Sequence, residues 1–148
     1  MSKSQQLIPL SGILICCFLT GGCTETVHPI EQLEIRGDYM DEWGGLHTIA
    51  NDLWSITFEG GPTGLFHIEQ YDNYNRVLFT QNDEDNEWNG GLYSRFDWAW
   101  NQEGTLFFCQ AAFDALTLTE AMETASPDTA DLTVSGCGGF SWTALEPL

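Results

Sequence analysis

Basic residues are nearly absent from this chain of 148 residues. It contains 22 aspartate and glutamate residues but only four lysine and arginine residues, and its formal net charge is −18. Lys3 is the only lysine, so the remaining basic residues are Arg36, Arg76 and Arg95. Such an acidic surface repels polyanions, and we therefore expect no nucleic-acid partner. The acidity favours solubility, for example in a saline habitat, over an acidic docking surface.

Short motifs of common enzymes are also missing. The chain has no C-x-x-C pair for thiol exchange, no G-x-S-x-G nucleophile elbow, and no glycine-rich loop with the lysine of a phosphate site. Its longest apolar run, residues 7–19, is too short to span a bilayer comfortably. The absence of these catalytic motifs favours a non-enzymatic function.

Aromatic residues, in contrast, are plentiful. Six tryptophans, nine phenylalanines and four tyrosines supply enough apolar surface to offset the conformational entropy of an ordered chain. The sequence therefore predicts a folded protein in spite of its high charge, and its length suits a single domain.

The N-terminal segment has the layout of a secretory signal. Residues 1–6 are polar and include Lys3, residues 7–19 are apolar, and small residues precede Cys23. The segment "LTGGC" (19–23) resembles the lipobox of bacterial lipoproteins, with Thr20 at the position usually held by an aliphatic residue and Leu19 one position before it. This resemblance implies cleavage before Cys23 and a lipid anchor on its thiol. The alternative is an ordinary cleaved signal whose Cys23 later forms a disulfide.

These features divide the chain into a signal peptide (1–22), a polar tether (23–32) and one domain (33–148). No aspartate follows Cys23, which resembles outer-membrane sorting in enteric bacteria. We expect a cell-envelope protein held by its lipid anchor, on the periplasmic or surface face of the outer membrane.

From residue 35 onward, apolar residues alternate with other residues in the period-two pattern of β-strands. The predicted strands are 35–40, 46–50, 53–58, 65–71, 76–81, 92–100 and 105–111, and residues 137–145 form a closing strand or a turn. Thr117 and Glu120 have capping-box spacing and predict one short helix over 117–126. We expect an all-β domain, an antiparallel meander that closes into a barrel of about eight strands, with this one short C-terminal helix.

Two of the five cysteines are expected to pair. Cys16 and Cys17 leave with the signal peptide if Cys23 is acylated, so Cys109 and Cys137 remain. An even pair in an exported chain most simply forms a disulfide.

A ligand cavity is the first candidate site. Phe96, Trp98 and Trp100 share one face of their strand, and we expect Trp54 and Phe66 across from them. These rings would form the wall of a cavity for a small apolar ligand, or they would simply fill the barrel. Arg95, on the other face beside Asp97, is the charged candidate for ligand binding.

A calcium loop is the second candidate, and Ca²⁺ is the one cofactor considered. Asp83, Asp85 and Glu87 occupy alternate positions, as ligands do in calcium loops. Trp88 stands where an EF-hand has its sharp-turn glycine, however, and Ser94 stands where it has a bidentate glutamate. The alternative is a solvated acidic loop.

The histidines suggest a third candidate, a hydrolase that uses His47 or His67 with Asp97. The alternative is that both are ordinary polar strand residues.

Two further resemblances complete the sequence evidence. The segment "RGDYMDEWGG" (36–45) resembles the start of lipocalins, in which Gly-x-Trp opens the first strand, with Tyr39 in place of the tryptophan. The segments "LFTQNDEDNEWNGGLYSRFDW", "FFCQAAFDA" and "GCGGFSW" resemble a group of secreted bacterial lipoproteins, which implies an envelope location and no particular mechanism. The leading prediction is binding of a small apolar ligand, and the main alternative is a filled barrel that binds another envelope protein.

Overall fold

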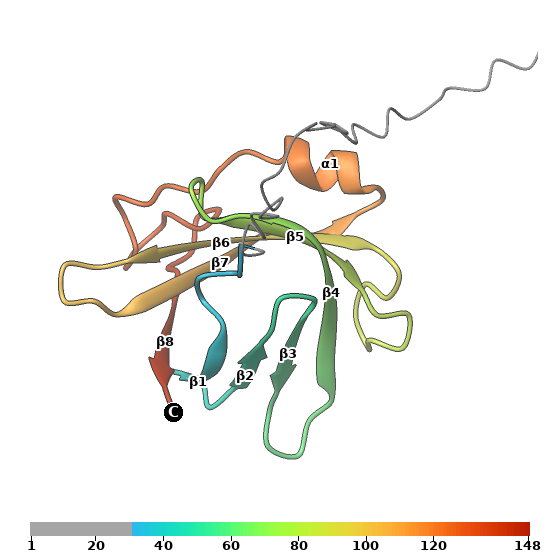
Figure 1. Ribbon diagram of the computed structural model, residues 1–148, viewed down its shortest axis with the longest axis horizontal. Coiled ribbons are helices and arrows are strands. Elements are labelled where there is room, and N and C mark those ends of the chain that lie inside the picture. Colours follow the sequence, from blue (N-terminus) through green and yellow to red (C-terminus); the bar gives the residue numbers. More distant parts are fainter. Residues whose placement is uncertain (1–30) are drawn as a thin grey trace, which may run out of the picture. The chain divides into compact units, whose positions relative to one another are not determined.

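Eight antiparallel strands close into a barrel in the computed structural model, which describes residues 31–148 (Figure 1). Each strand pairs with the next, and β8 pairs with β1. The strands are β1 (Gly37–Asp41), β2 (Leu46–Ile49), β3 (Leu53–Thr57), β4 (Thr63–Asp72), β5 (Val77–Asn82), β6 (Tyr93–Trp100), β7 (Leu106–Ala115) and β8 (Thr143–Pro147). Residues 31–148 contain one helix, α1 (Leu118–Glu123), which follows β7. The predicted all-β barrel of about eight strands with a short C-terminal helix is confirmed.

Element boundaries differ from the prediction mainly near the C-terminus. β7 runs to Ala115 rather than residue 111, and its register against β6 shifts near Arg95. The closing strand begins only at Thr143, because Cys137 and Phe140 bond to each other's backbone in a tight turn. The helix begins as predicted, since the Thr117 hydroxyl accepts a hydrogen bond from the Glu120 backbone N–H.

The predicted signal peptide (1–22), Cys23 and most of the tether (23–32) lie outside the described residues. Within residues 31–148, no helix has the length and apolarity needed to cross a membrane.

One end of the barrel is plugged by the segment that precedes β1. Leu33 and Ile35 are each only 1% exposed and belong to the main core. The side-chain oxygens of Asn51 and Asn73, from two turns at this end, accept hydrogen bonds from the backbone N–H groups of Leu33 and Glu34, both at 3.0 Å. We call this the closed end. The opposite end carries the connections 42–45, 58–62 and 83–92, which we call the mouth loops.

A second layer covers the outer face of β5, β6 and β7. It consists of α1 and the segment 124–142 that leads to β8 (Figure 1). Ala121 of α1 packs on Val77 and Phe79, while Trp142 packs on Ala99 and on Cys109, one half of the disulfide. The layer gives this face of the sheet a small core of its own.

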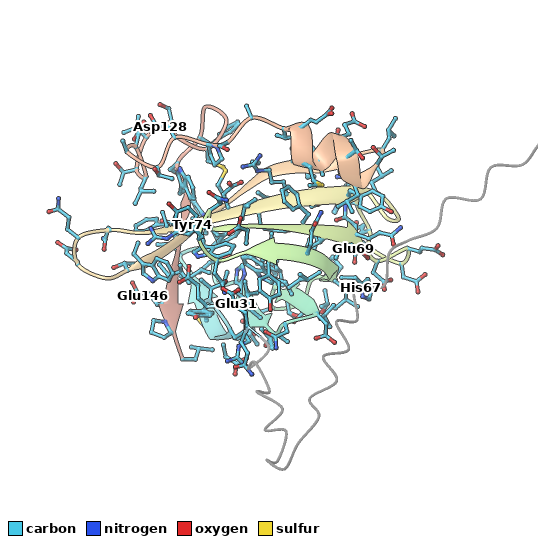
Figure 2. All side chains as sticks on the ribbon, turned by 45° about the horizontal axis from the view of Figure 1, so that its top comes forward. Glu31, His67, Glu69, Tyr74, Asp128 and Glu146 are labelled. Atoms are coloured by element: carbon cyan, nitrogen blue, oxygen red, sulfur yellow. A yellow bond between two sulfur atoms is a disulfide. The ribbon has the colours of Figure 1, made fainter. Side chains whose placement is uncertain are left out.

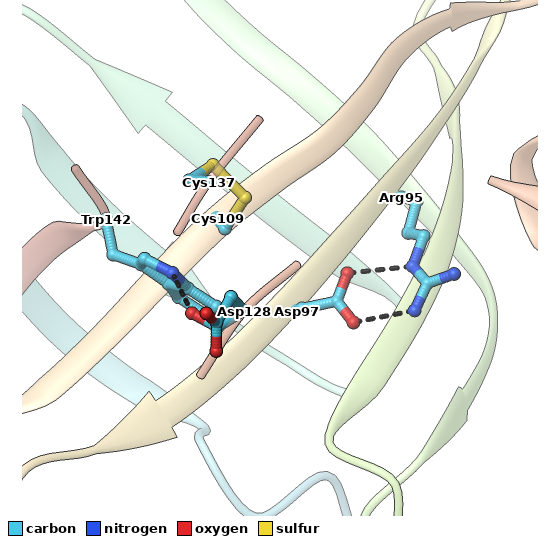
Figure 3. The surroundings of a disulfide bond; sticks show 6 residues. All are labelled: Arg95, Asp97, Cys109, Asp128, Cys137 and Trp142. Carbon is cyan, nitrogen blue, oxygen red and sulfur yellow. Dashed lines mark hydrogen bonds and ion pairs between the residues drawn. A yellow bond between two sulfur atoms is a disulfide. The ribbon is translucent and has the colours of Figure 1, made fainter. Parts of the chain in front are cut away.

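The covering layer is fastened by a disulfide and by a buried ion pair (Figure 3). Cys109 on β7 is bonded to Cys137, as predicted, and a loop of this length contributes about 3.5 kcal/mol to stability by the loop-closure estimate. The Arg95 guanidinium donates two hydrogen bonds of 2.8 Å to the Asp97 carboxylate. It also donates to the Thr124 carbonyl and the Ser126 hydroxyl, both in the covering layer.

Replacing Arg95 is therefore expected to destabilise the fold strongly. Arg95→Met leaves the Asp97 carboxylate buried without its partner, and we expect the free energy of unfolding to fall by about 3–5 kcal/mol in urea titrations. The double variant with Asp97→Leu removes both charges and should recover most of that loss.

Arg76→Met is the matched control. Its guanidinium is half exposed and lies 3.9 Å from Glu34, so we expect a loss of no more than about 1 kcal/mol. Equal losses for Arg95→Met and Arg76→Met would contradict the anchoring role of Arg95.

Candidate functional site

The middle of the barrel is filled by aromatic side chains. The rings of Trp54 and Phe96 stack with their centroids 4.7 Å apart. Phe66 meets Phe96 edge-on at 5.1 Å, and Phe108 lies 5.3 Å from Trp54. Trp54 and Phe96 are completely buried. At this level the residues predicted to surround a ligand pack on one another.

A chain of buried hydrogen bonds runs beside these rings. The Trp54 indole N–H donates to Nδ1 of His47 at 3.1 Å, and Nε2 of His47 lies 2.9 Å from the Asp41 carboxylate. The second carboxylate oxygen of Asp41 accepts backbone hydrogen bonds from Trp43 and Gly45 at 2.8 and 2.7 Å. The chain thus ties the interior to the mouth loop 42–45.

These partners fix the protonation of His47. An indole N–H can only donate, so Nδ1 of His47 must accept and the ring proton must be on Nε2, where it is donated to Asp41. The imidazole is fully buried, and this burial lowers its pKa, although the hydrogen bond and charge of Asp41 act in the opposite direction. His47 is therefore neutral, and both of its ring nitrogens are engaged in hydrogen bonds.

Gly45 is required by this arrangement. A Cβ atom at Gly45 would lie 2.4 Å from an Asp41 carboxylate oxygen and 2.9 Å from the ring of Phe58. Any larger residue would displace the carboxylate that holds His47.

A cavity of about 200 Å³ opens at the mouth, above the filled interior. Its apolar lining comes from the rings of Phe66, Trp88 and Phe113 with Pro62 and Gly64. Its polar lining comes from Thr63, Asn82, Asn86, Glu87, Asn89 and Gln110. Trp88 is 74% exposed, so a large apolar ring stands at the entrance in contact with water. We call this the mouth cavity.

Asparagine side chains hold the loop that carries Trp88. Asn86 clamps the backbone of Leu65 on β4, accepting from its N–H at 2.9 Å and donating to its carbonyl at 2.8 Å. Asn82 donates to the carbonyls of Asn89 and Phe113. These bonds connect the loop to β4 and β7 and hold the walls of the cavity in place.

A polar layer separates the mouth cavity from the aromatic core. Gln110 donates to the Ser94 hydroxyl, which donates in turn to the side-chain oxygen of Asn82. Gln110 lines the cavity. Its amide oxygen accepts no hydrogen bond from residues 31–148. Thr80, the register partner of Ser94, is fully buried and its hydroxyl has no partner among the same residues.

The six predicted ligand residues are distributed over three places. Trp54, Phe96 and Trp98 are in the core, and Phe66 reaches from the core to the mouth cavity. Trp100 lies towards the closed end, with the guanidinium of Arg76 4.9 Å above its ring. Arg95 is on the opposite side of β6, under the covering layer. Of the six, only Phe66 lines the mouth cavity.

The predicted calcium ligands are not brought together. Asp83 lies 2.8 Å from Nε2 of His67 and accepts a hydrogen bond from the backbone N–H of Asp85, while Glu87 is at the mouth cavity. No cluster of three or more His, Cys, Asp or Glu side chains suited to a metal occurs in the described range 31–148. Calcium binding stays a prediction that no contact here supports.

The predicted pairing of a histidine with Asp97 is not formed. His47 pairs with Asp41 inside the barrel, His67 pairs with Asp83 on the outside of β4 (Figure 2), and Asp97 pairs with Arg95 under the covering layer. The contact with His67 lowers the pKa of Asp83, as does the hydrogen bond from Asp85. His47, His67 and Asp97 therefore belong to three separate pairs.

Sequence reasoning missed most of the mouth cavity. The sequence pattern marks Trp88 only as a departure from a calcium loop, and it does not mark Asn82, Gln110 or Phe113 as site residues. One signal was available, because Gln110 is a polar residue on the face of its strand that Leu106 and Phe108 fill with apolar side chains. Such an interruption of an apolar face marks a polar layer inside a barrel.

Comparisons with protein-family models, with curated proteins and with solved structures find no match to this chain. The candidate site therefore depends on the geometry described above.

Neutral His47 predicts a pH dependence of stability. The unfolded chain takes up a proton near the ordinary histidine pKa of 6.5, whereas the folded state resists it, so the free energy of unfolding should fall as pH falls from 7 to 5.5. The slope can reach about 1.4 kcal/mol per pH unit for one proton. Urea titrations at several pH values measure it.

A variant of His47 tests whether this group causes the effect. His47→Gln should be less stable at pH 7 but should show a flatter pH dependence than the unmodified protein. An unchanged slope in His47→Gln would show that another group is responsible.

Proposed function

We propose that this protein is an exported, lipid-anchored cell-envelope protein that binds one small ligand at the mouth of its barrel. The observation that carries the proposal is the mouth cavity, a hollow with aromatic walls whose loop is held by the side chains of Asn82 and Asn86. The filled interior supports a ligand at the mouth rather than deep in the barrel, because Trp54, Phe96 and Phe108 already occupy the space inside the barrel.

The size of the mouth cavity limits the ligand. About 200 Å³ is below the 300–1,000 Å³ typical of pockets for drug-sized molecules. The cavity suits a single small group, or the end of a longer molecule that extends into solvent past Trp88.

A non-enzymatic role agrees with the histidine contacts. Both ring nitrogens of His47 are engaged in buried hydrogen bonds, and His67 is paired with Asp83 outside the barrel, away from the mouth cavity lining. We therefore assign these residues to structure.

The filled interior also favours a second candidate, a module that binds another envelope protein. Its contact surface would be the mouth loops, which expose Trp43, Phe58 and Trp88 among acidic residues. Exposed aromatic rings of this kind are enriched in protein interfaces.

The first test is native mass spectrometry of the protein purified gently from a bacterial envelope. We expect one bound mass beyond the acyl groups, with occupancy reduced about tenfold or more in Trp88→Ala, because loss of a ring that contacts the ligand typically costs at least 1.4 kcal/mol. Trp43→Ala is the matched control, since Trp43 is 72% exposed but does not line the cavity. A bare chain would contradict ligand binding and favour the protein-interaction candidate, and equal occupancy in both variants would place the ligand elsewhere.

The anchor is tested through Cys23, which lies outside the described residues. Two acyl chains of a diacylglyceryl group hold a protein firmly to a membrane, so Cys23→Ser should move the protein to the soluble fraction and remove the acyl mass. Cys17→Ser, in the predicted signal peptide, should leave both unchanged. Continued membrane association of Cys23→Ser would refute the anchor.

A further inference from the structure

The polar groups at the mouth cavity show what kind of ligand it suits. Asn86 uses both ends of its amide on the backbone of Leu65. Asn82 donates to two carbonyls and accepts from Ser94, and the hydroxyl of Thr63 is paired with that of Thr57 at 3.0 Å. These side chains have few free positions for a ligand that needs many hydrogen bonds, such as a sugar.

Of the remaining lining residues Asn89 is neutral, and the aromatic rings, Glu87 and Gln110 favour positive charge. Aromatic rings attract cations through their electron-rich faces, and Phe66, Trp88 and Phe113 supply three such rings around one small space. Glu87 lines the same cavity and forms no ion pair with the residues that the structure describes, so its negative charge lies close to the rings. Gln110 also lines the cavity, and its amide oxygen has no hydrogen-bond donor among residues 31–148.

The charge distribution of the barrel acts in the same direction. The mouth loops contain the acidic residues Glu42, Glu59, Asp83, Glu84, Asp85 and Glu87, and no lysine or arginine. Arg36 bonds to the plug residue Leu33 and Arg76 lies over Trp100, both towards the closed end, while Arg95 is buried under the covering layer. A cation approaching the mouth is therefore attracted, and an anion is repelled.

We propose that the mouth cavity binds a small organic cation of the quaternary ammonium type. An alkylated nitrogen has a positive charge spread over a nearly apolar surface, so it gains from aromatic rings and carboxylates and requires no hydrogen bond. This inference names the ligand class of the proposed binding function and depends on that function being at the mouth.

The test uses two probes of the same shape. Choline and its neutral isostere 3,3-dimethylbutan-1-ol differ in whether the branched centre is a charged nitrogen or a carbon. In calorimetric titrations of the purified protein, we expect choline to bind at least about fivefold more tightly, which corresponds to a cation–π contribution of about 1 kcal/mol. Added salt should weaken the binding of choline but not that of the alcohol.

Two acidic variants locate the effect. Glu87→Gln should weaken choline binding by about two- to fivefold and leave the alcohol unchanged. Glu84→Gln removes the same charge from the same loop, but Glu84 does not line the mouth cavity, so its effect should be clearly smaller. Equal effects of the two variants would show a general field rather than a site for the cation.

Two outcomes separate the ligand class from the binding function. Equal binding of both probes, abolished by Trp88→Ala, would overturn the cation assignment and support a mouth cavity for neutral apolar groups. Binding of neither probe would also overturn the cation assignment, and the envelope-derived bound mass and its dependence on Trp88 would then decide independently whether the mouth holds a ligand.

Discussion

The barrel depends on a buried chain of hydrogen bonds from Trp54 through His47 to Asp41. Each group satisfies the next, and the carboxylate at the end is held by backbone N–H groups of a mouth loop. A histidine in an aromatic interior would otherwise leave unpaired polar atoms, which are costly to bury. Because this chain of hydrogen bonds leaves no polar atom of Trp54 or His47 unpaired, the rings of Trp54, Phe96 and Phe108 can close around it without a central cavity.

A filled centre has consequences for both surfaces of the sheet. Inside, it leaves the mouth cavity above the polar layer of Ser94 and Gln110. On the outside, β5 to β7 carry apolar residues that the covering layer buries. Arg95, Asp97 and the disulfide hold this layer in place. The mouth cavity and the covering layer thus lie on opposite faces of β5 and β7.

The fold was predictable from sequence because period-two alternation, turn residues and an even cysteine pair are local signals. The site was less predictable, since its parts come from β4, the loop 83–92 and β7, whose register shifts cannot be read from one strand. Alternation correctly separated Arg95 and Asp97 from Phe96 and Trp98, yet it could not distinguish rings that fill a barrel from rings that surround a ligand. Trp88 was inaccessible to this reasoning because it belongs to no strand.

The most direct measurement is ¹⁵N NMR of the imidazole and indole groups in the ligand-free protein at pH 7. A filled barrel predicts a single neutral His47 tautomer protonated at Nε2, and a Trp54 indole proton that exchanges with water far more slowly than that of exposed Trp88. An imidazolium or Nδ1-protonated His47, or equally fast exchange at Trp54 and Trp88, would contradict the closed interior and return the ligand site to the centre of the barrel.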